Sequence, residues 1–356
     1  MDSHLDLAEN VTLFGRDLTL RADKIRALEK RTTRQATVSL PELERGSIAT
    51  AFATVTAGFS AKDVGETFEP RSAIYHTSEE AEAQALTQIR LYEQWEEQGR
   101  VRLLRSVEDL DDHLHLWQHD RKLGLVLLME GADPIVNVRD LLEWWQRGVR
   151  MIGLTFGDTT YGTGVGGGST TFKRGGLTLR GFELLEQMAE LGFIWDISHL
   201  AEEGVWQGLA LGFPRVCASH ANAQALTPTD RHLSDEVLRA LAERAGVIGL
   251  VLYNGFLESG WKGNRSISVT LDEHLRRHAD HVARVCGWRY LGIGSDLDGG
   301  FGLEESPSEI DTVADLHKVG DVVPAEFRGA VLGANWLRFL RSSLPQTSSW
   351  LIGWAG

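Results

Sequence analysis

The sequence predicts an α/β fold, a (β/α)8 barrel of the TIM type, formed as one domain over residues 1–356 with a helical insertion at about residues 57–120. Three observations predict this fold. Short apolar runs recur along the chain, polar helix-like segments separate them, and no change of composition marks a linker. Strands that are apolar on both faces are typical of a parallel sheet covered by helices. A six-stranded doubly wound sheet is the main alternative.

Eight segments are candidates for the barrel strands. A short strand leads into "SHLD" at the beginning of the sequence, and seven clearer apolar runs follow it. These runs lie at residues 46–55, 123–130, 149–156, 192–199, 214–220, 246–253 and 290–296.

Helical patterns connect these runs. Residues 177–192 and 233–246 both have the apolar spacing of a helix, and in the second pattern Ser234 is suited to the N-cap while Gly246 ends it. Residues 78–99 form a longer helical stretch within the interval 57–120, which contains no strong strand. We therefore expect this interval to be an insertion packed outside the barrel.

Composition excludes several partners. Acidic residues outnumber basic ones by 50 to 36, so the net charge of −14 repels phosphate backbones and predicts no nucleic-acid partner. Clearly apolar runs such as residues 245–253 are too short to cross a bilayer, which predicts no membrane span. The first residues lack the basic and apolar regions of a signal peptide, and Cys217 and Cys286 lie in apolar contexts that favour free thiols. These features favour a cytoplasmic protein.

Polar side chains capable of chemistry follow the strand candidates. In a (β/α)8 barrel the carboxyl ends of all strands share one face, where active sites are formed. Imidazoles and carboxylates gathered there would leave buried charge without a cation, and mixed nitrogen and oxygen ligands suit zinc. A bridging carboxylate can hold two ions about 3.5–4 Å apart, an arrangement that polarises a carbonyl and activates water for hydrolysis. The residues concerned are His4, Asp6, Glu130, His199, His220 and Asp296.

Each of these residues also has a structural interpretation, and Glu130 could be a solvated strand end. His4 and Asp6 could belong to a frayed terminus, because chain ends make few contacts. His199 could be a hydrogen-bonded core histidine, and His220 could orient a loop. Asp196 is more easily explained as a cap than as a ligand. Asp296 in "GSDLDGG" could form an Asx turn.

Several motifs resemble those of a known family. The segments "DSHLD", "MEGADP", "DISHL", "SHANAQAL", "DRHLSDE" and "GIGSDLDGG" occur in the order found in the renal (membrane) dipeptidases, which are binuclear zinc enzymes of the amidohydrolase type. The closing "VLGANWLRFL" is similar to the helix that ends that family. The resemblance covers nearly the whole chain and is weakest across residues 57–120.

The resemblance implies two Zn²⁺ ions per chain, a homodimer, and hydrolysis of a dipeptide or related small amide by a metal-bridging hydroxide. It implies that Asp296 is the acid/base beside the substrate and that Arg231 binds the substrate's terminal carboxylate, a role that suits a guanidinium fork. A surface salt bridge from Arg231 to Asp230 or Asp235 is the alternative. It further implies that His4 and Asp6 hold one zinc, that His199 and His220 hold the second, and that Glu130 bridges both as part of the catalytic centre.

One position departs from the family. Phe156 in "GLTFGDTTYGTG" stands where the family has a histidine that binds the scissile carbonyl, and the loss of one oxyanion donor can cost about 10²–10³ in rate. Asp158, Thr159 or Tyr161 could replace it, and the glycine-rich "YGTGVGGGST" resembles a mobile loop over the site. The departure leaves two alternatives open: a different amide, ester or lactam substrate, or a catalytically weak metal-binding barrel.

Overall fold

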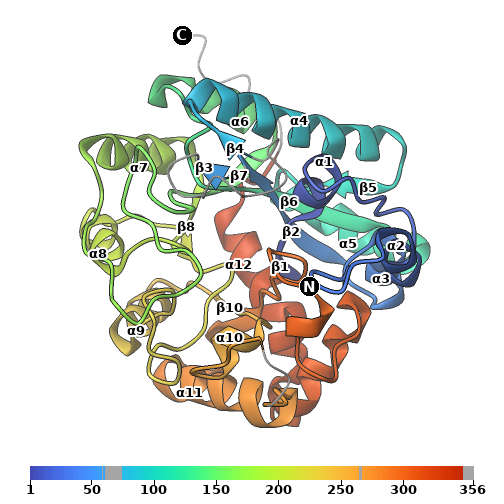
Figure 1. The fold of residues 1–356 in the computed structure, drawn as a ribbon. Helices are drawn as coiled ribbons and strands as arrows, with labels where there is room; N and C mark the ends of the chain where they lie inside the picture. The colour runs from blue at the N-terminus through green and yellow to red at the C-terminus, as the bar shows by residue number, and fades with distance from the viewer. Residues whose placement is uncertain (58, 61–73, 264–266, 348–356) are drawn as a thin grey trace.

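Eight parallel strands surround a central axis in the computed structural model, with the helices arranged around them (Figure 1). The structure describes residues 1–57, 59–60, 74–263 and 267–347. The strands are β1 (Asp2–Leu5), β2 (Thr50–Thr56), β6 (Leu123–Glu130), β7 (Val149–Gly153), β8 (Ile194–Asp196), β9 (Val216–Cys217), β10 (Ile248–Leu250) and β11 (Leu291–Ile293).

Backbone pairing joins these strands in sequence order. One continuous path runs β1-β2-β6-β7-β8-β9, β10 pairs with β11, and an isolated parallel bridge between Ala218 and Ile248 connects the two groups. Every one of these pairs is parallel, as expected for strands joined by helical crossovers. The (β/α)8 prediction is therefore confirmed, and the doubly wound sheet is wrong.

Side chains connect β11 to β1. The Ser3 hydroxyl donates a hydrogen bond to the Ile293 carbonyl at 2.8 Å, and the Asp2 carboxylate accepts one from the Ser295 N–H at 2.8 Å. Glycine is needed on the neighbouring strands, because a Cβ at Gly249 would lie 2.0 Å from the Ser219 carbonyl oxygen. The barrel interior beside Asp2 and Ser3 is therefore narrow and polar.

Alternate residues of each strand enter two different cores. Val126 and Leu128 lie four and two residues before Glu130, so they share its inward face, and they pack in an inner cluster with Trp336 of α12. The Trp336 indole also donates to the Ile293 carbonyl at 3.2 Å. Outward residues such as Leu125 pack against the surrounding helices. Burial on both faces explains why the strand sequences are continuous apolar runs.

Most helices lie on the outside of the ring (Figure 1). The α-helices are α1 (Leu7–Thr12), α2 (Ala22–Glu29), α3 (Leu40–Arg45), α4 (Ser78–Glu97), α5 (Val107–Asp120), α6 (Leu141–Gln146), α7 (Leu179–Leu191), α8 (Glu202–Ala210), α9 (Asp235–Glu243), α10 (Asn254–Leu257), α11 (Arg276–Cys286) and α12 (Asn335–Ser343). Shorter helical turns are η2 (Val138–Asp140), η3 (Leu271–Leu275), η4 (Trp288–Tyr290), η5 (Leu303–Glu305), η6 (Val313–Val322), η7 (Ala325–Phe327) and η8 (Ala330–Ala334).

The predicted helix boundaries agree with these elements. Ser234 caps α9, where its hydroxyl accepts a hydrogen bond from the Val237 N–H at 3.3 Å. Cys217 and Cys286 are free thiols, as expected. Within the part of the chain that the structure describes, no helix combines the length and apolar character needed to span a bilayer.

The interval between β2 and β6 holds more than helices. It contains α4 and α5, but also β5 (Val101–Leu103), which pairs with the first half of β6, and the short pair β3 (Phe59–Ser60) and β4 (Ile74–Tyr75). The expectation of no strong strand missed β5, because three residues are too few to show a pattern. Residues 58 and 61–73 of the predicted insertion lie outside the described residues.

Candidate metal centre

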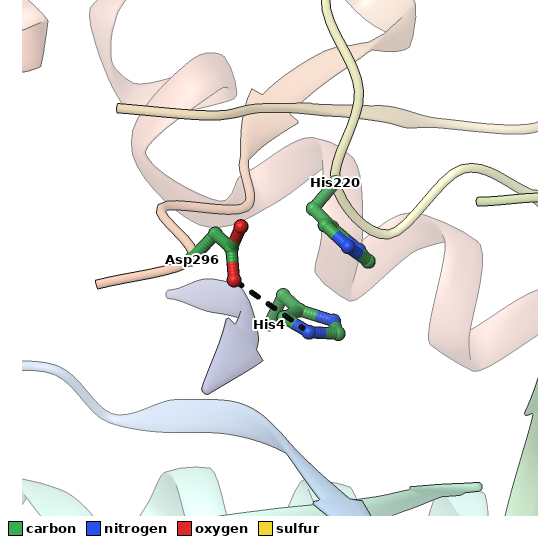
Figure 2. A group of neighbouring side chains, drawn as sticks. All are labelled: His4, His220 and Asp296. Atoms are coloured by element: carbon green, nitrogen blue, oxygen red, sulfur yellow. Dashed lines mark ion pairs between the residues drawn. The ribbon is translucent and has the colours of Figure 1, made fainter. Parts of the chain in front are cut away.

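Six polar residues predicted from the sequence meet at the carboxyl ends of the strands. His4 is on β1 and Asp6 follows it directly, Glu130 ends β6, and His199, His220 and Asp296 each come three residues after a strand. Figure 2 shows His4, His220 and Asp296 pointing toward one another from separate parts of the chain. The terminus is well packed, with His4 only 1% exposed, so the frayed-tail interpretation is wrong.

Glu130 lies at the centre of the cluster. Its Oε1 is 3.4 Å from His4 Nε2, 3.3 Å from His199 Nε2 and 3.5 Å from His220 Nε2. This oxygen is buried and receives no hydrogen bond from any residue that the structure describes. A buried carboxylate oxygen without a donor is costly, so three ring nitrogens directed at it indicate a site for a cation.

A second group of oxygens extends the cluster on the side of His4. The Nε2 of His4 lies 3.6 Å from Asp6 Oδ1 and 3.9 Å from Asp296 Oδ1 (Figure 2). Three sets of side chains bring their ligand atoms within 4.8 Å of one another: His4–Asp6–Glu130, Glu130–His199–His220 and His4–His220–Asp296. Overlapping sets that share Glu130 fit two ions held by a common carboxylate.

The ionisation of the cluster also fits a cation. Burial lowers the pKa of His4 to about 4 and holds the pKa values of His199 and His220 well below their usual range, so the rings are neutral and able to bind a metal. Burial, followed by the charge of Glu130, raises the pKa of both Asp6 and Asp296 well above their usual range. Carboxylates this close together repel one another when ionised, and a bound metal would supply compensating positive charge.

Hydrogen bonds fix the orientation of the three rings. His199 Nδ1 lies 2.8 Å from the Val165 carbonyl oxygen, an acceptor, so Nδ1 carries the proton and Nε2 is free for a ligand. Ser219 Oγ lies 2.8 Å from His220 Nδ1 and 3.3 Å from His4 Nδ1. The same hydroxyl donates to the Asp196 carboxylate. One serine therefore supports two of the predicted metal ligands.

Asp196 has a structural role, as its sequence context favours, but it caps no helix that the structure describes, since α8 has Ala201 at its N-cap. Its carboxylate accepts hydrogen bonds from the N–H groups of Ser198 at 3.1 Å and Ser219 at 2.8 Å. It thereby fixes the start of the loops that carry His199 and His220.

The loop after β11 is strained. Asp296 and Asp298 have φ values of 60° and 66°, in the left-handed region that few non-glycine residues adopt. The Asp298 carboxylate is held by the N–H groups of Thr37 and Val38 at 2.8 and 2.9 Å and by Arg16 at 3.2 Å. Asp298 thus anchors the turn that aims Asp296 at the cluster.

Arg231 is buried beside the cluster rather than exposed. Its Nη2 lies 3.2 Å from His199 Nε2 and donates to the His220 carbonyl at 2.9 Å, while its Nε and Nη1 have no hydrogen-bond partner among the described residues. The alternative of a surface salt bridge is wrong, since Arg231 is 2% exposed and Asp235 instead pairs with His281 at 2.7 Å.

A cavity of about 420 Å³ opens over the cluster. Asp6, Glu130, His199 and Asp296 line it together with Phe156, whose ring meets the His199 ring edge-on with centroids 5.0 Å apart. Several lining residues were not found from the sequence, although Glu9 lies only three positions after Asp6. These additional residues include Glu9, Phe14, Arg34, Tyr253, Phe256, Phe301 and Glu305.

The proposed substitutes for the missing histidine are engaged elsewhere. Asp158 pairs with Lys173 at 2.8 Å, the Thr159 hydroxyl donates to the Leu154 carbonyl at 2.9 Å, and the buried Tyr161 hydroxyl donates to the Ile135 carbonyl. The expectation that one of them replaces the oxyanion donor is therefore wrong, because turns of the loop direct all three side chains to structural partners.

The glycine-rich loop is anchored along part of its length. Gly162 and Gly164 form isolated antiparallel bridges with Leu177 and Leu200, and the Val165 N–H donates to the His199 carbonyl at 2.8 Å. A Cβ at Gly164 would lie 1.8 Å from the Gly157 carbonyl oxygen, so this approach requires glycine. The prediction of a mobile loop is therefore wrong for this part, which supports His199.

A parallel barrel with imidazole and carboxylate groups converging at the carboxyl ends of its strands is the arrangement expected of a metal-dependent hydrolase. The sequence profile of the membrane dipeptidases, peptidase family M19, matches residues 1–346, so the chain belongs to this family. It is a hydrolase acting on peptide bonds, and the family implies a metal cofactor.

Individual relatives agree with this assignment. An uncharacterized protein from the 5′ region of pqqA in Klebsiella pneumoniae is 30% identical over 257 residues, covering 70% of this chain and 91% of that protein. The crystal structure of dipeptidase AC, a metallopeptidase of family M19, superposes with a TM-score of 0.76 at 25% identity, covering 96% of this chain and 98% of the other.

A metallopeptidase from Rhodobacter sphaeroides, solved with a phosphinate mimic of the dipeptide L-Ala-D-Ala, has the same fold. Its TM-score is 0.76 at 24% identity, with the same shares of the two chains covered.

Proposed function

We propose that the protein is a zinc dipeptidase that holds two ions per chain and hydrolyses the amide bond of a dipeptide. The observation that carries this proposal is the buried Glu130 Oε1, which lies within 3.5 Å of three histidine nitrogens and opens onto a cavity of about 420 Å³. His4 and Asp6 would hold one ion, His199 and His220 the other, and Glu130 both. When bound, such a pair polarises a carbonyl and lowers the pKa of water.

Asp296 and Arg231 would act on the substrate in different ways. Asp296, which lines the cavity and lies 3.9 Å from His4 Nε2, would accept the proton of the attacking water and pass it to the leaving amine. Arg231 would bind the substrate carboxylate through its two unpaired nitrogen atoms. Burial of this guanidinium strengthens such a bond, because water does not compete for it.

Metal analysis tests the centre directly. The purified protein is expected to carry close to two zinc ions per chain, and His199→Ala is expected to lose at least one. His115→Ala, an exposed histidine on α5, is the matched control and is expected to keep both ions. The proposal is refuted if the protein binds no zinc, cobalt or manganese after reconstitution.

A dipeptide library tests the substrate. It would include D-residues at the C-terminal position, because the Rhodobacter sphaeroides structure contains a mimic of L-Ala-D-Ala. We expect saturable hydrolysis that is lost in Arg231→Ala. Hydrolysis that survives this change would argue against a role for Arg231 in binding the carboxylate.

Phe156 favours a second candidate, a related hydrolase of another amide, ester or lactam. A phenyl ring beside His199 cannot donate a hydrogen bond to a developing oxyanion. If dipeptides are the substrates, Phe156→His is expected to raise kcat. A wild type inert on every amide, with no gain in Phe156→His, would instead indicate a metal-binding barrel of little catalytic power.

We also propose a cytoplasmic homodimer, on the basis of the two free thiols and the resemblance to the family. Light scattering of the purified protein tests the dimer, and fractionation of the source cells tests the location.

A further inference from the structure

Glu9 is a buried carboxylate without a partner. It lies on α1, lines the cavity, and is only 7% exposed. Among the residues described by the structure, none donates a hydrogen bond to its carboxylate or pairs with it. Equally buried acids are satisfied: Glu42 pairs with Arg45 at 2.6 Å, and Asp298 accepts two backbone N–H bonds. A carboxylate left unpaired at this depth indicates that its partner comes from outside the chain.

Glu9 is not needed as a metal ligand. The three described sets of side chains that could share an ion all lie among the six predicted site residues and do not include it. It nevertheless lies close enough to Asp6 and Glu130 to affect both electrostatically. Glu9 therefore borders the cluster on the side of Asp6 without belonging to it.

Two opposite charges lie beside different members of the cluster. Arg231 contacts His199 and His220, whereas Glu9 lies on the helix that follows Asp6. A dipeptide whose scissile carbonyl sits at the cluster has a cationic nitrogen on one side and a carboxylate on the other. If its carboxylate binds Arg231, its ammonium would extend toward Asp6 and Glu9.

The other charges of the cavity do not cancel Glu9. Burial raises the pKa of Glu9 to about 8, and the charge of Arg34, which also lines the cavity, opposes this rise only in part. Arg34 is exposed and forms no ion pair with Glu9 among the described residues, and Glu305 is another acid. Exposed charges are screened by solvent, whereas a buried one is not. The end of the cavity at Glu9 is consequently suited to a cation.

We propose that Glu9 binds an ammonium group on the amine side of the scissile bond, which makes the enzyme selective for substrates with a cationic nitrogen there. This inference rests on the proposed dipeptidase activity. Two sources of the ammonium share this chemistry: the free α-amino group of the dipeptide, and a basic side chain of its first residue. A charge-assisted bond of this kind supplies both affinity and orientation.

Paired substrates test the proposal with the metal-loaded enzyme. L-Ala-L-Ala carries the α-ammonium, and N-propionyl-L-alanine has the same amide without it. If Glu9 binds the α-ammonium, we expect kcat/KM of Glu9→Gln for L-Ala-L-Ala to fall about 10–100-fold, the range of a hydrogen bond to a charged group. The value for N-propionyl-L-alanine is expected to change less than threefold. A general loss of folded or metal-loaded enzyme lowers kcat/KM for both substrates equally, so the ratio of the two kcat/KM values within one variant does not change.

A second pair identifies the source of the ammonium. L-Lys-L-Ala and L-norleucyl-L-Ala differ in the side-chain cation alone. A loss confined to L-Lys-L-Ala assigns Glu9 to the side chain, and an equal loss on every free dipeptide assigns it to the α-amino group. Both outcomes support the proposal.

Four results separate the possible failures. An equal loss on the propionyl substrate, or no loss on any substrate, overturns the role of Glu9. If Glu305→Gln changes the ratio of the two kcat/KM values as much as Glu9→Gln does, the role of Glu9 is overturned as well, because the effect would then come from cavity charge in general. A wild type that hydrolyses none of the free dipeptides refutes the dipeptidase activity itself.

Discussion

Ser219 offers the sharpest test of how the ligand cluster is organised. Its hydroxyl oxygen lies 2.8 Å from His220 Nδ1 and 3.3 Å from His4 Nδ1, and its proton is donated to Asp196. An oxygen with two lone pairs can accept from both rings at once. Since each ring then keeps its proton on Nδ1, both Nε2 atoms are free to bind a metal.

Ser219→Ala removes this support without removing a ligand. Loss of an outer partner of a metal-bound histidine typically costs 10–100-fold in metal affinity. This range corresponds to about 1.4–2.7 kcal/mol. Because two rings share the serine and one of the two distances is short, we expect zinc affinity to fall at least about 10-fold.

A competition titration with a zinc chelator measures this effect. Ser198→Ala is the matched control: the Ser198 hydroxyl accepts from the His220 backbone N–H at 3.2 Å, and no ring nitrogen of the described residues bonds to it. We expect Ser198→Ala to change zinc affinity less than threefold. The reasoning is refuted if Ser219→Ala keeps the wild-type affinity, or if both variants lose it equally.

Two further predictions concern stability. Burial lowers the pKa of His278 to about 4, so between about pH 6.5 and 4 this residue is protonated in the unfolded chain but not in the folded one. The free energy of unfolding therefore decreases as pH falls through this range, by about 1.4 kcal/mol per pH unit for this group. Urea denaturation of the metal-free protein at several pH values should show a shallower loss in His278→Gln, and identical slopes would contradict this. Trp336→Ala should lower the free energy of unfolding by about 3–5 kcal/mol, because the indole is fully buried and closes the inner core. A urea titration that shows less than about 1 kcal/mol would contradict this closing role.

The convergence of the six candidate ligands could be predicted from sequence because two local patterns coincide. Continuous apolar runs identify strands that are covered on both faces, and residues two apart on a strand share a face. His4 and Asp6 are therefore expected on the same face of their strand, and Glu130 is expected to be the last of the inward-facing residues of β6. The barrel rule then placed the six site residues on one face.

Other features depend on contacts between distant segments. Ser219 reaches His4 across 215 positions, and Asp298 is held by Thr37 across 261. No local pattern signals such pairs, because each residue has many other possible partners. The strand β5 was missed for a different reason: its pairing with β6 supplies the order that three residues cannot encode.

The sequence by itself determined the barrel, the ligand types and the place where they meet, since strand periodicity and chemical type are local properties. The tertiary structure alone decided which groups surround that place. It buried Arg231 against the histidines, engaged Asp158 and Tyr161 in structural bonds, and left Glu9 without a partner in the cavity. These outcomes follow from the close approach of loops from different strands, and only folding fixes that approach.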